Sequence, residues 1–147
     1  MGFRQAVTVC IQDYYTFSGR ARRPEYWWFF LFILAGSLIF SAIDTAIFGS
    51  NMLLGLNGLF GLLTAVPQFA VSWRRLHDTG RPGWFNLLPL VPLVPLFANT
   101  QFAKPLLDQT DQVILFYTSV FFGAVILIWL VLPTKSGPNR FGQEPPS

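Results

Sequence analysis

Three short polar stretches contain most of the side chains in this sequence that could carry out chemistry. In chain order they read SGRARRPEYWW from Ser18, WRRLHDTGRPGW from Trp73 and GPNRFG from Gly137. The second stretch holds the only histidine, followed by the tripeptide Asp-Thr-Gly, which matches the aspartic-protease signature. All three contain arginine, whose planar guanidinium suits phosphate. The residue types therefore suggest three chemistries to weigh: hydrolysis, acid–base catalysis and the binding of anions.

Hydrolysis is the weakest of these interpretations. Aspartic proteases need two carboxylates that share a proton, whereas here the tripeptide lies in a single turn between apolar runs. His77 and Asp78 are sequence neighbours that would diverge on a helix, and Ser18 is not part of a nucleophile elbow. Cys10 and His77 are the only soft metal ligands, too few for a structural zinc site. We therefore predict no catalytic residue, no metal site and no cofactor.

The composition indicates a membrane protein. Only 12% of the 147 residues are charged and 52% are hydrophobic, whereas an ordinary soluble domain carries about 25% charged residues. The apolar residues lie in long uncharged runs and do not alternate with polar ones, which is typical of membrane spans. A net charge of +3 could suit nucleic acid, but membrane topology alone explains an excess of Lys and Arg. We expect no nucleic-acid partner.

Four apolar runs have about the 20 residues that a membrane-spanning helix needs. They cover residues 27–48, 52–71, 82–103 and 113–132. The first is longer than the core of a signal peptide and has no clear cleavage site. The third contains Pro89, Pro92 and Pro95, and because each proline removes a backbone hydrogen bond, we expect a kinked or partly unwound segment.

Within the spans, small residues four positions apart predict where helices pack closely. Such spacings occur at Ser37-Ser41-Thr45, Gly61-Ala65 and Ser119-Gly123. Asp44 is the only acid in a span and lies near the outer end, where we expect it to reach water. Asn57, Gln68 and Asn86 are interpreted as hydrogen-bonding partners between helices.

The basic residues predict an orientation for the four spans. Nine of the ten Lys and Arg residues fall on one side of the membrane in this arrangement, and only Lys104 lies on the other. The positive-inside rule makes the richer side cytoplasmic. The sequence therefore predicts an all-α membrane protein with four transmembrane helices and both termini in the cytoplasm (N-in/C-in). We expect residues 1–147 to form a single membrane domain.

Two segments lie outside the spans. In residues 3–15, Phe3, Ala6, Val7 and Cys10 follow helical spacing, which predicts an N-terminal interfacial amphipathic helix. An ordinary helix packed on the bundle is the alternative. Residues 133–147 form a predicted cytoplasmic tail, whose proline-rich end is expected to fray.

This topology brings all three polar stretches to the cytoplasmic face, where we predict one polar cluster. Its members are Arg20, Arg22, Arg23, Glu25, Arg74, Arg75, His77, Asp78, Arg81, Asn139 and Arg140. In the leading interpretation, Glu25 and Asp78 bridge arginines from different segments and tie the spans together. The arginines could also hold anionic lipid headgroups, since each basic residue at a membrane surface contributes about 1 kcal/mol. Docking of a partner protein is a further alternative.

The same stretches, in this order and with these spans between them, closely resemble the domain of unknown function 805 family. Its members are small bacterial inner-membrane proteins of the YhaH type. The resemblance rests on GRARRPEYWW, RRLHDTGRPGW and GPNRFG and covers nearly the whole chain. It implies a multi-span fold in the bacterial inner (plasma) membrane, and it implies no activity. The three prolines of the third span and the short tail depart from the family's pattern.

We therefore expect a non-enzymatic integral membrane protein whose partners are membrane lipids, anionic phospholipids in particular. Two other functions stay open. The proline-broken third span suggests a transporter or channel subunit, which would need a homo-oligomer because four helices leave little room for a pore. An enzyme acting on lipid-linked phosphates, with His77 as acid or base, is the second.

Overall fold

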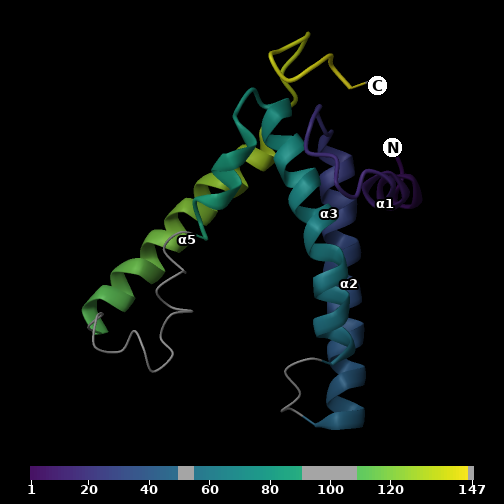
Figure 1. Ribbon diagram of the computed structural model, residues 1–147, viewed down its shortest axis with the longest axis vertical. Helices are drawn as coiled ribbons and strands as arrows, with labels where there is room; N and C mark the ends of the chain where they lie inside the picture. Colours follow the sequence, from purple (N-terminus) through teal and green to yellow (C-terminus); the bar gives the residue numbers. More distant parts are fainter. Residues whose placement is uncertain (50–54, 91–108, 146–147) are drawn as a thin grey trace.

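The computed structural model of the protein describes residues 1–49, 55–90 and 109–145 (Figure 1). Within these ranges the chain forms four α-helices and one 3-10 helix, and no strand. They are α1 (Phe3–Gln12), α2 (Arg23–Phe48), α3 (Leu56–Asp78), η1 (Gly83–Leu87) and α5 (Gln109–Val131). The prediction of an all-α protein is confirmed for the described part of the chain.

Two of the described helices are long and apolar enough to cross a membrane, namely α2 and the Val113–Val131 part of α5. They correspond to the first and fourth predicted spans. α2 begins before the predicted Trp27, because Pro24 fits the first turn of a helix and Glu25 favours its positive end. Large apolar side chains cover the outside of both helices, such as Leu38, which is 65% exposed. Such surfaces are suited to lipid rather than water.

The second predicted span corresponds to α3, which is less apolar than α2 and α5. Asn57, Pro67 and Gln68 interrupt its hydrophobic residues, and the helix continues past the predicted end at Val71 to Asp78. Its last two turns are charged. Residues 52–54 of this predicted span lie outside the described residues.

The third predicted span is described only as far as Leu90. It begins with the 3-10 helix η1 and not with an α-helix, while the kink expected at its prolines stays a prediction. Pro92 and Pro95 lie outside the described residues. The hairpin before η1 is tight: Gly80 has a φ of 80°, and a Cβ on Gly83 would lie 2.1 Å from the Trp73 indole.

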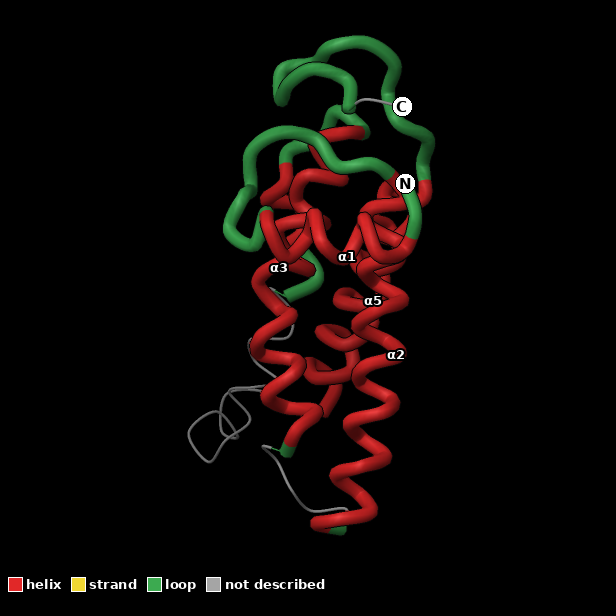
Figure 2. The backbone as a smooth tube through the Cα atoms, turned by 90° about the vertical axis from the view of Figure 1, so that its right-hand side faces the viewer, coloured by secondary structure: helices red, strands yellow, loops and turns green. Residues whose placement is uncertain are grey.

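The helices meet at one end of the molecule and separate toward the other. α2 and α3 pack side by side, α1 lies across them, and α5 diverges from α3 (Figure 1). The N-terminus and the connecting segments 13–22, 79–82 and 132–145 lie at the shared end (Figure 2), which we call the polar end. The buried hydrophobic core lies there too and includes Cys10, Phe29, Val71, Leu76 and Ile126.

One prediction about the segments outside the spans was wrong. The N-terminal helix ends at Gln12 and not at residue 15. Asp13 instead pairs with Arg74, and the Tyr14 hydroxyl donates a hydrogen bond to the Leu63 carbonyl, so both side chains turn toward α3. In the tail, the Pro145 carbonyl accepts a hydrogen bond from Arg22 at 2.6 Å, while the last two residues of the end that was expected to fray lie outside the described residues.

The structure adds one close helix contact that the motifs did not predict: a Cβ on Gly36 would lie 2.4 Å from the Phe60 ring. A Cβ on Gly61 or Gly123 would meet no described atom within 4 Å. Four-residue spacing does not say which face of a helix meets its neighbour, so the three motifs stay predictions.

Asp44 was expected to reach water and instead is buried. Its two carboxylate oxygens accept the backbone N–H groups of Leu56 and Asn57 at 2.9 and 2.8 Å. These donors have no partner within the helix, because they lie in its first turn, and an acid there also favours the helix dipole. Asp44 of α2 therefore caps the start of α3. Gly55 permits the contact, since a Cβ there would lie 2.3 Å from the carboxylate.

Candidate functional site

The last turn of α3 lies at the centre of the candidate site. α3 stays helical through Asp78 and ends before Gly80, whose positive φ turns the chain away. This places Arg74, Arg75, His77 and Asp78 at the polar end, where all four are buried. The segment before α2 and the tail after α5 cover them.

Asp78 holds two arginines with one carboxylate. Its Oδ1 accepts a hydrogen bond from Arg20 Nε at 2.9 Å, and its Oδ2 accepts one from Arg75 Nη1. The side chains of Asp78 and Arg75 are fully buried and that of Arg20 is 1% exposed. We call these three residues the Asp78 node. Charges so far from water interact strongly, and the loss of one partner leaves another uncompensated.

The remaining donors of both arginines bind backbone carbonyls of the α5 end and the tail. Arg75 donates from Nε to the Leu130 carbonyl at 3.2 Å and from Nη2 to that of Leu132. Arg20 donates to the carbonyls of Lys135 and Gly137. The last carbonyls of a helix lack partners and carry negative partial charge. The end of α5 thus offsets the extra positive charge of the node.

Burial has the largest effect on the pKa of Arg75. It lowers the pKa of the Arg75 guanidinium from its usual value, while the Asp78 carboxylate acts in the opposite direction. Arginine still keeps its proton in proteins. The node is therefore a permanent charge cluster rather than a proton-transfer site.

His77 is packed between the first and third polar stretches. Its Nδ1 lies 3.0 Å from the Gly19 carbonyl, so this nitrogen carries a proton and donates it. The ring stacks on Phe141 with centroids 3.9 Å apart, and Asn139 donates its amide to the His77 carbonyl. Burial lowers the pKa of His77; the bond to Gly19 opposes this shift, and the charge of Arg140 adds to it. His77 is consequently neutral near pH 7.

A second ion-pair group lies beside the node. Arg74 Nη1 contacts Asp13 Oδ2 at 2.7 Å, and Arg74 Nη2 lies 3.0 Å from Glu25 Oε1. The Glu25 contact is an ion pair without hydrogen-bond geometry, since both of its atoms lack a hydrogen-bond partner. A cavity of about 340 Å³ borders this group and is also lined by Arg22. Arg74 thus ties α1 and α2 to α3.

The outer basic residues have fewer protein contacts. Arg23 is exposed and makes no hydrogen bond or ion pair with any residue that the structure describes. Arg140 is exposed and lies over the Phe141 ring at 4.6 Å, while Arg81 lies over Trp129 at 4.7 Å. A hollow of about 210 Å³ is lined by Arg22, Arg23, Pro24, Thr134, Glu144 and Pro145. These cations are available to groups outside the protein.

The structure therefore divides the eleven predicted residues into two sets. Six are buried and engaged with other parts of the chain: Arg20, Glu25, Arg74, Arg75, His77 and Asp78. The other five lie at or near the surface of the same end: Arg22, Arg23, Arg81, Asn139 and Arg140.

Sequence reasoning missed several contributors to the site. Asp13 directly follows α1, and only its charge could have suggested that it pairs with Arg74. Phe141 belongs to the third polar stretch, but nothing in the sequence predicted that it stacks on His77. The carbonyls of Leu130 and Leu132 could not be found from side-chain types at all.

The chemistry available at this site is that of charge pairing. No group of three potential metal ligands occurs among the described residues. The two buried acids of the polar end, Glu25 and Asp78, both contact arginine. Within the described chain, no hydroxyl or thiol group hydrogen-bonds to the His77 ring.

Comparison with known proteins places this chain among membrane proteins. The family described as "Protein of unknown function (DUF805)" matches residues 14–143. The inner membrane protein YhaI of Escherichia coli K12 is 32% identical over 140 residues, covering 92% of this chain and 90% of the relative. The inner membrane protein YhaH of the same strain is 38% identical over 87 residues, covering 57% of this chain and 71% of the relative. No solved structure matches.

Proposed function

This chain belongs to the DUF805 family, as its motifs predicted, and on that premise we propose that it is a non-enzymatic, four-span protein of the bacterial inner membrane. Both termini and the polar end face the cytoplasm. The Asp78 node clamps the ends of the helices together. The surface that it organises holds anionic lipid headgroups through its outer arginines.

Several observations support this topology. α2 and α5 are apolar enough to span, and α3 runs beside α2 from one end to the other (Figure 1). An even number of spans brings both ends of the chain to one side, and the described ends, Met1 and Pro145, are both at the polar end. That end also holds the nine basic residues that the structure describes, which is what the positive-inside rule expects of a cytoplasmic face.

The division of the arginines is the observation that carries the proposed function. Arg20 and Arg75 donate hydrogen bonds to Asp78 and to backbone carbonyls, so both side chains stabilise the fold. Arg23 and Arg140 are exposed on the same end. Arginine at a membrane surface attracts anionic lipid by about 1 kcal/mol and fits phosphate through its planar fork.

The surroundings of His77 support a non-catalytic role. A general acid or base must reach a proton on the substrate. His77 is 8% exposed, its ring is stacked on Phe141 and its Nδ1 is bound to a backbone carbonyl, so these contacts serve the fold.

Native mass spectrometry in micelles of mixed phosphatidylcholine and phosphatidylglycerol tests the headgroup site. We expect wild type to retain phosphatidylglycerol preferentially. Arg23→Ala/Arg140→Ala should lower that retention by roughly thirtyfold, because two charges that contribute about 1 kcal/mol each are lost, with an unchanged melting temperature.

The matched control is Arg4→Ala/Lys135→Ala, which removes the same charge from exposed positions. This control should keep most of the retention. Equal losses in the two double variants would mean that general surface charge attracts the lipid, and would overturn the site. Retention unchanged in Arg23→Ala/Arg140→Ala would also overturn it.

A further inference from the structure

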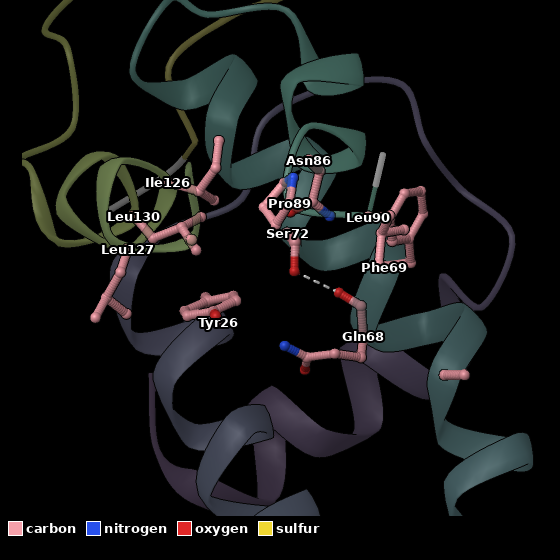
Figure 3. Close-up of a pocket in the computed structure, with 12 residues that line it drawn as sticks. Tyr26, Gln68, Phe69, Ser72, Asn86, Pro89, Leu90, Ile126, Leu127 and Leu130 are labelled. Atoms are coloured by element: carbon pink, nitrogen blue, oxygen red, sulfur yellow. Dashed lines mark hydrogen bonds between the residues drawn. The ribbon is translucent and has the colours of Figure 1, made fainter. Parts of the chain in front are cut away.

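A second cavity, of about 340 Å³, lies where α3 and α5 diverge, next to η1 (Figure 3). We call it the α3–α5 crevice. It differs from the charged polar end in its lining: none of the described residues around it is charged. Its volume is within the range of small-molecule sites, about 300–1,000 Å³. It is open on one side, next to helices whose outer surfaces are apolar.

Most of the crevice wall is hydrophobic. Leu127 and Leu130 of α5 face it from one side and Leu90 from another (Figure 3). Gly123 of α5 also lines it, and a Cβ on this glycine would meet no described atom within 4 Å. Among the described residues, the wall therefore leaves space beside Gly123 for an apolar chain.

A few uncharged polar side chains interrupt this wall. They are Tyr26, Gln68, Ser72 and Asn86. The amide nitrogen of Gln68 is turned toward Tyr26 (Figure 3), and the Ser72 hydroxyl donates to the Gln68 backbone carbonyl at 2.7 Å. Gln68 Oε1 is buried and has no hydrogen-bond partner. A buried acceptor left unpaired costs about 1–3 kcal/mol, so this oxygen favours a ligand that brings a donor.

We propose that the α3–α5 crevice binds a glycerolipid with an uncharged, hydroxyl-bearing headgroup. The hydroxyl donates a hydrogen bond to Gln68 Oε1, and one acyl chain lies between α3 and α5 beside Gly123. The absence of charge in the described lining selects against a phosphate, because an unpaired charge is strongly disfavoured away from water. We place the entrance for the acyl chain on the bilayer side, because the outer surfaces of the helices beside the crevice are apolar. This site is separate from the proposed headgroup surface and does not depend on it.

Photo-crosslinking with a diacylglycerol that carries a diazirine in its acyl chain tests the proposal. The full chain is reconstituted in phosphatidylcholine vesicles, and labelled peptides are mapped by mass spectrometry. We expect wild type to be labelled on the crevice-lining turns of α3 and α5. Gly123→Leu fills the space beside the acyl chain and should reduce this labelling at least tenfold. Gln68→Leu removes the acceptor and should also reduce it.

Gly61→Leu is the matched control, because a Cβ there also meets no described atom and Gly61 does not line the crevice. Its labelling should equal that of wild type. Unchanged labelling in both Gly123→Leu and Gln68→Leu would overturn the site, as would labels spread evenly over all helices. A phosphatidylglycerol probe with the same diazirine chain should label the crevice at least tenfold less. Equal labelling by that probe would overturn the choice of an uncharged headgroup.

Discussion

Asp78 Oδ1 accepts a hydrogen bond from Arg20 Nε at 2.9 Å, although the two residues are 58 positions apart in the chain. The other oxygen of the same carboxylate binds Arg75, whose remaining donors cover the last carbonyls of α5. One acid thus joins the segment before α2, the end of α3 and the end of α5. The contact is buried, so its partners depend on one another.

Asp78→Asn should destabilise the protein by about 3–5 kcal/mol, because it leaves two buried guanidinium groups without their counter-charge. Reversible unfolding with SDS in mixed micelles measures this change. Asp13→Asn is the matched control. It breaks the Arg74 pair at a carboxylate that is 39% exposed, and exposed pairs are worth about 1 kcal/mol or less. Equal losses in the two variants would contradict the special position of Asp78.

Acidification should destabilise the protein through His77. Burial lowers the pKa of His77 from its usual 6.5, so below about pH 6.5 the unfolded state binds more protons than the native state. Stability is therefore complete above this pH and decreases as the pH falls toward the lower native pKa. Unfolding measured between about pH 7.5 and pH 5 should show this slope, and His77→Gln should flatten it. A wild type that becomes more stable as the pH falls through this window would contradict the lowered pKa of His77.

Gly83→Ala should lower stability by about 1–3 kcal/mol, as overpacking of a tight contact does. The added Cβ would lie 2.1 Å from the Trp73 indole, which is a rigid ring. Gly123→Ala is the control, since its Cβ meets no described atom, and alanine in a helix gains up to about 1 kcal/mol over glycine. Melting temperatures that shift equally for both variants would argue against the hairpin geometry.

Cys10 should resist thiol reagents in the native state. Burial raises the pKa of the Cys10 thiol to about 12, with Glu25 adding to the shift and Arg74 opposing it, and the residue is fully buried. Because only the thiolate reacts, maleimide labelling near neutral pH should be at least about a hundredfold slower than in SDS. Similar rates in both conditions would show that Cys10 of α1 is not buried against α2 as described.

The sequence was most informative where residue type alone decides the outcome. Long apolar runs predicted α2 and α5, and the one-sided charge predicted that the polar stretches share one end. The turn after α3 was also predictable from the sequence, because a glycine was expected to adopt a positive φ there and Gly80 does so. The idea that Asp78 lies between arginines followed from pairing rules for buried charge, although the choice of Arg20 as partner needed the fold.

Other features depended on tertiary packing and left no trace in the sequence. Asp44 looked like a solvated acid, but the start of α3 approaches it closely, and its carboxylate caps that helix. The partners of Arg75 beyond Asp78 are backbone carbonyls, which every residue has. The stacking of His77 on Phe141 joins residues from two distant motifs and depends on the path of the tail.

The most direct test of the clamp is a double-mutant cycle on Arg20 and Asp78. The free energy of unfolding would be measured for wild type, Arg20→Met, Asp78→Asn and the double variant. The node predicts a coupling above about 1 kcal/mol, with the double variant less destabilised than the sum of the single variants, because removing Arg20 relieves the charge that Asp78→Asn leaves unpaired. Single effects that add within about 0.5 kcal/mol would contradict the clamp.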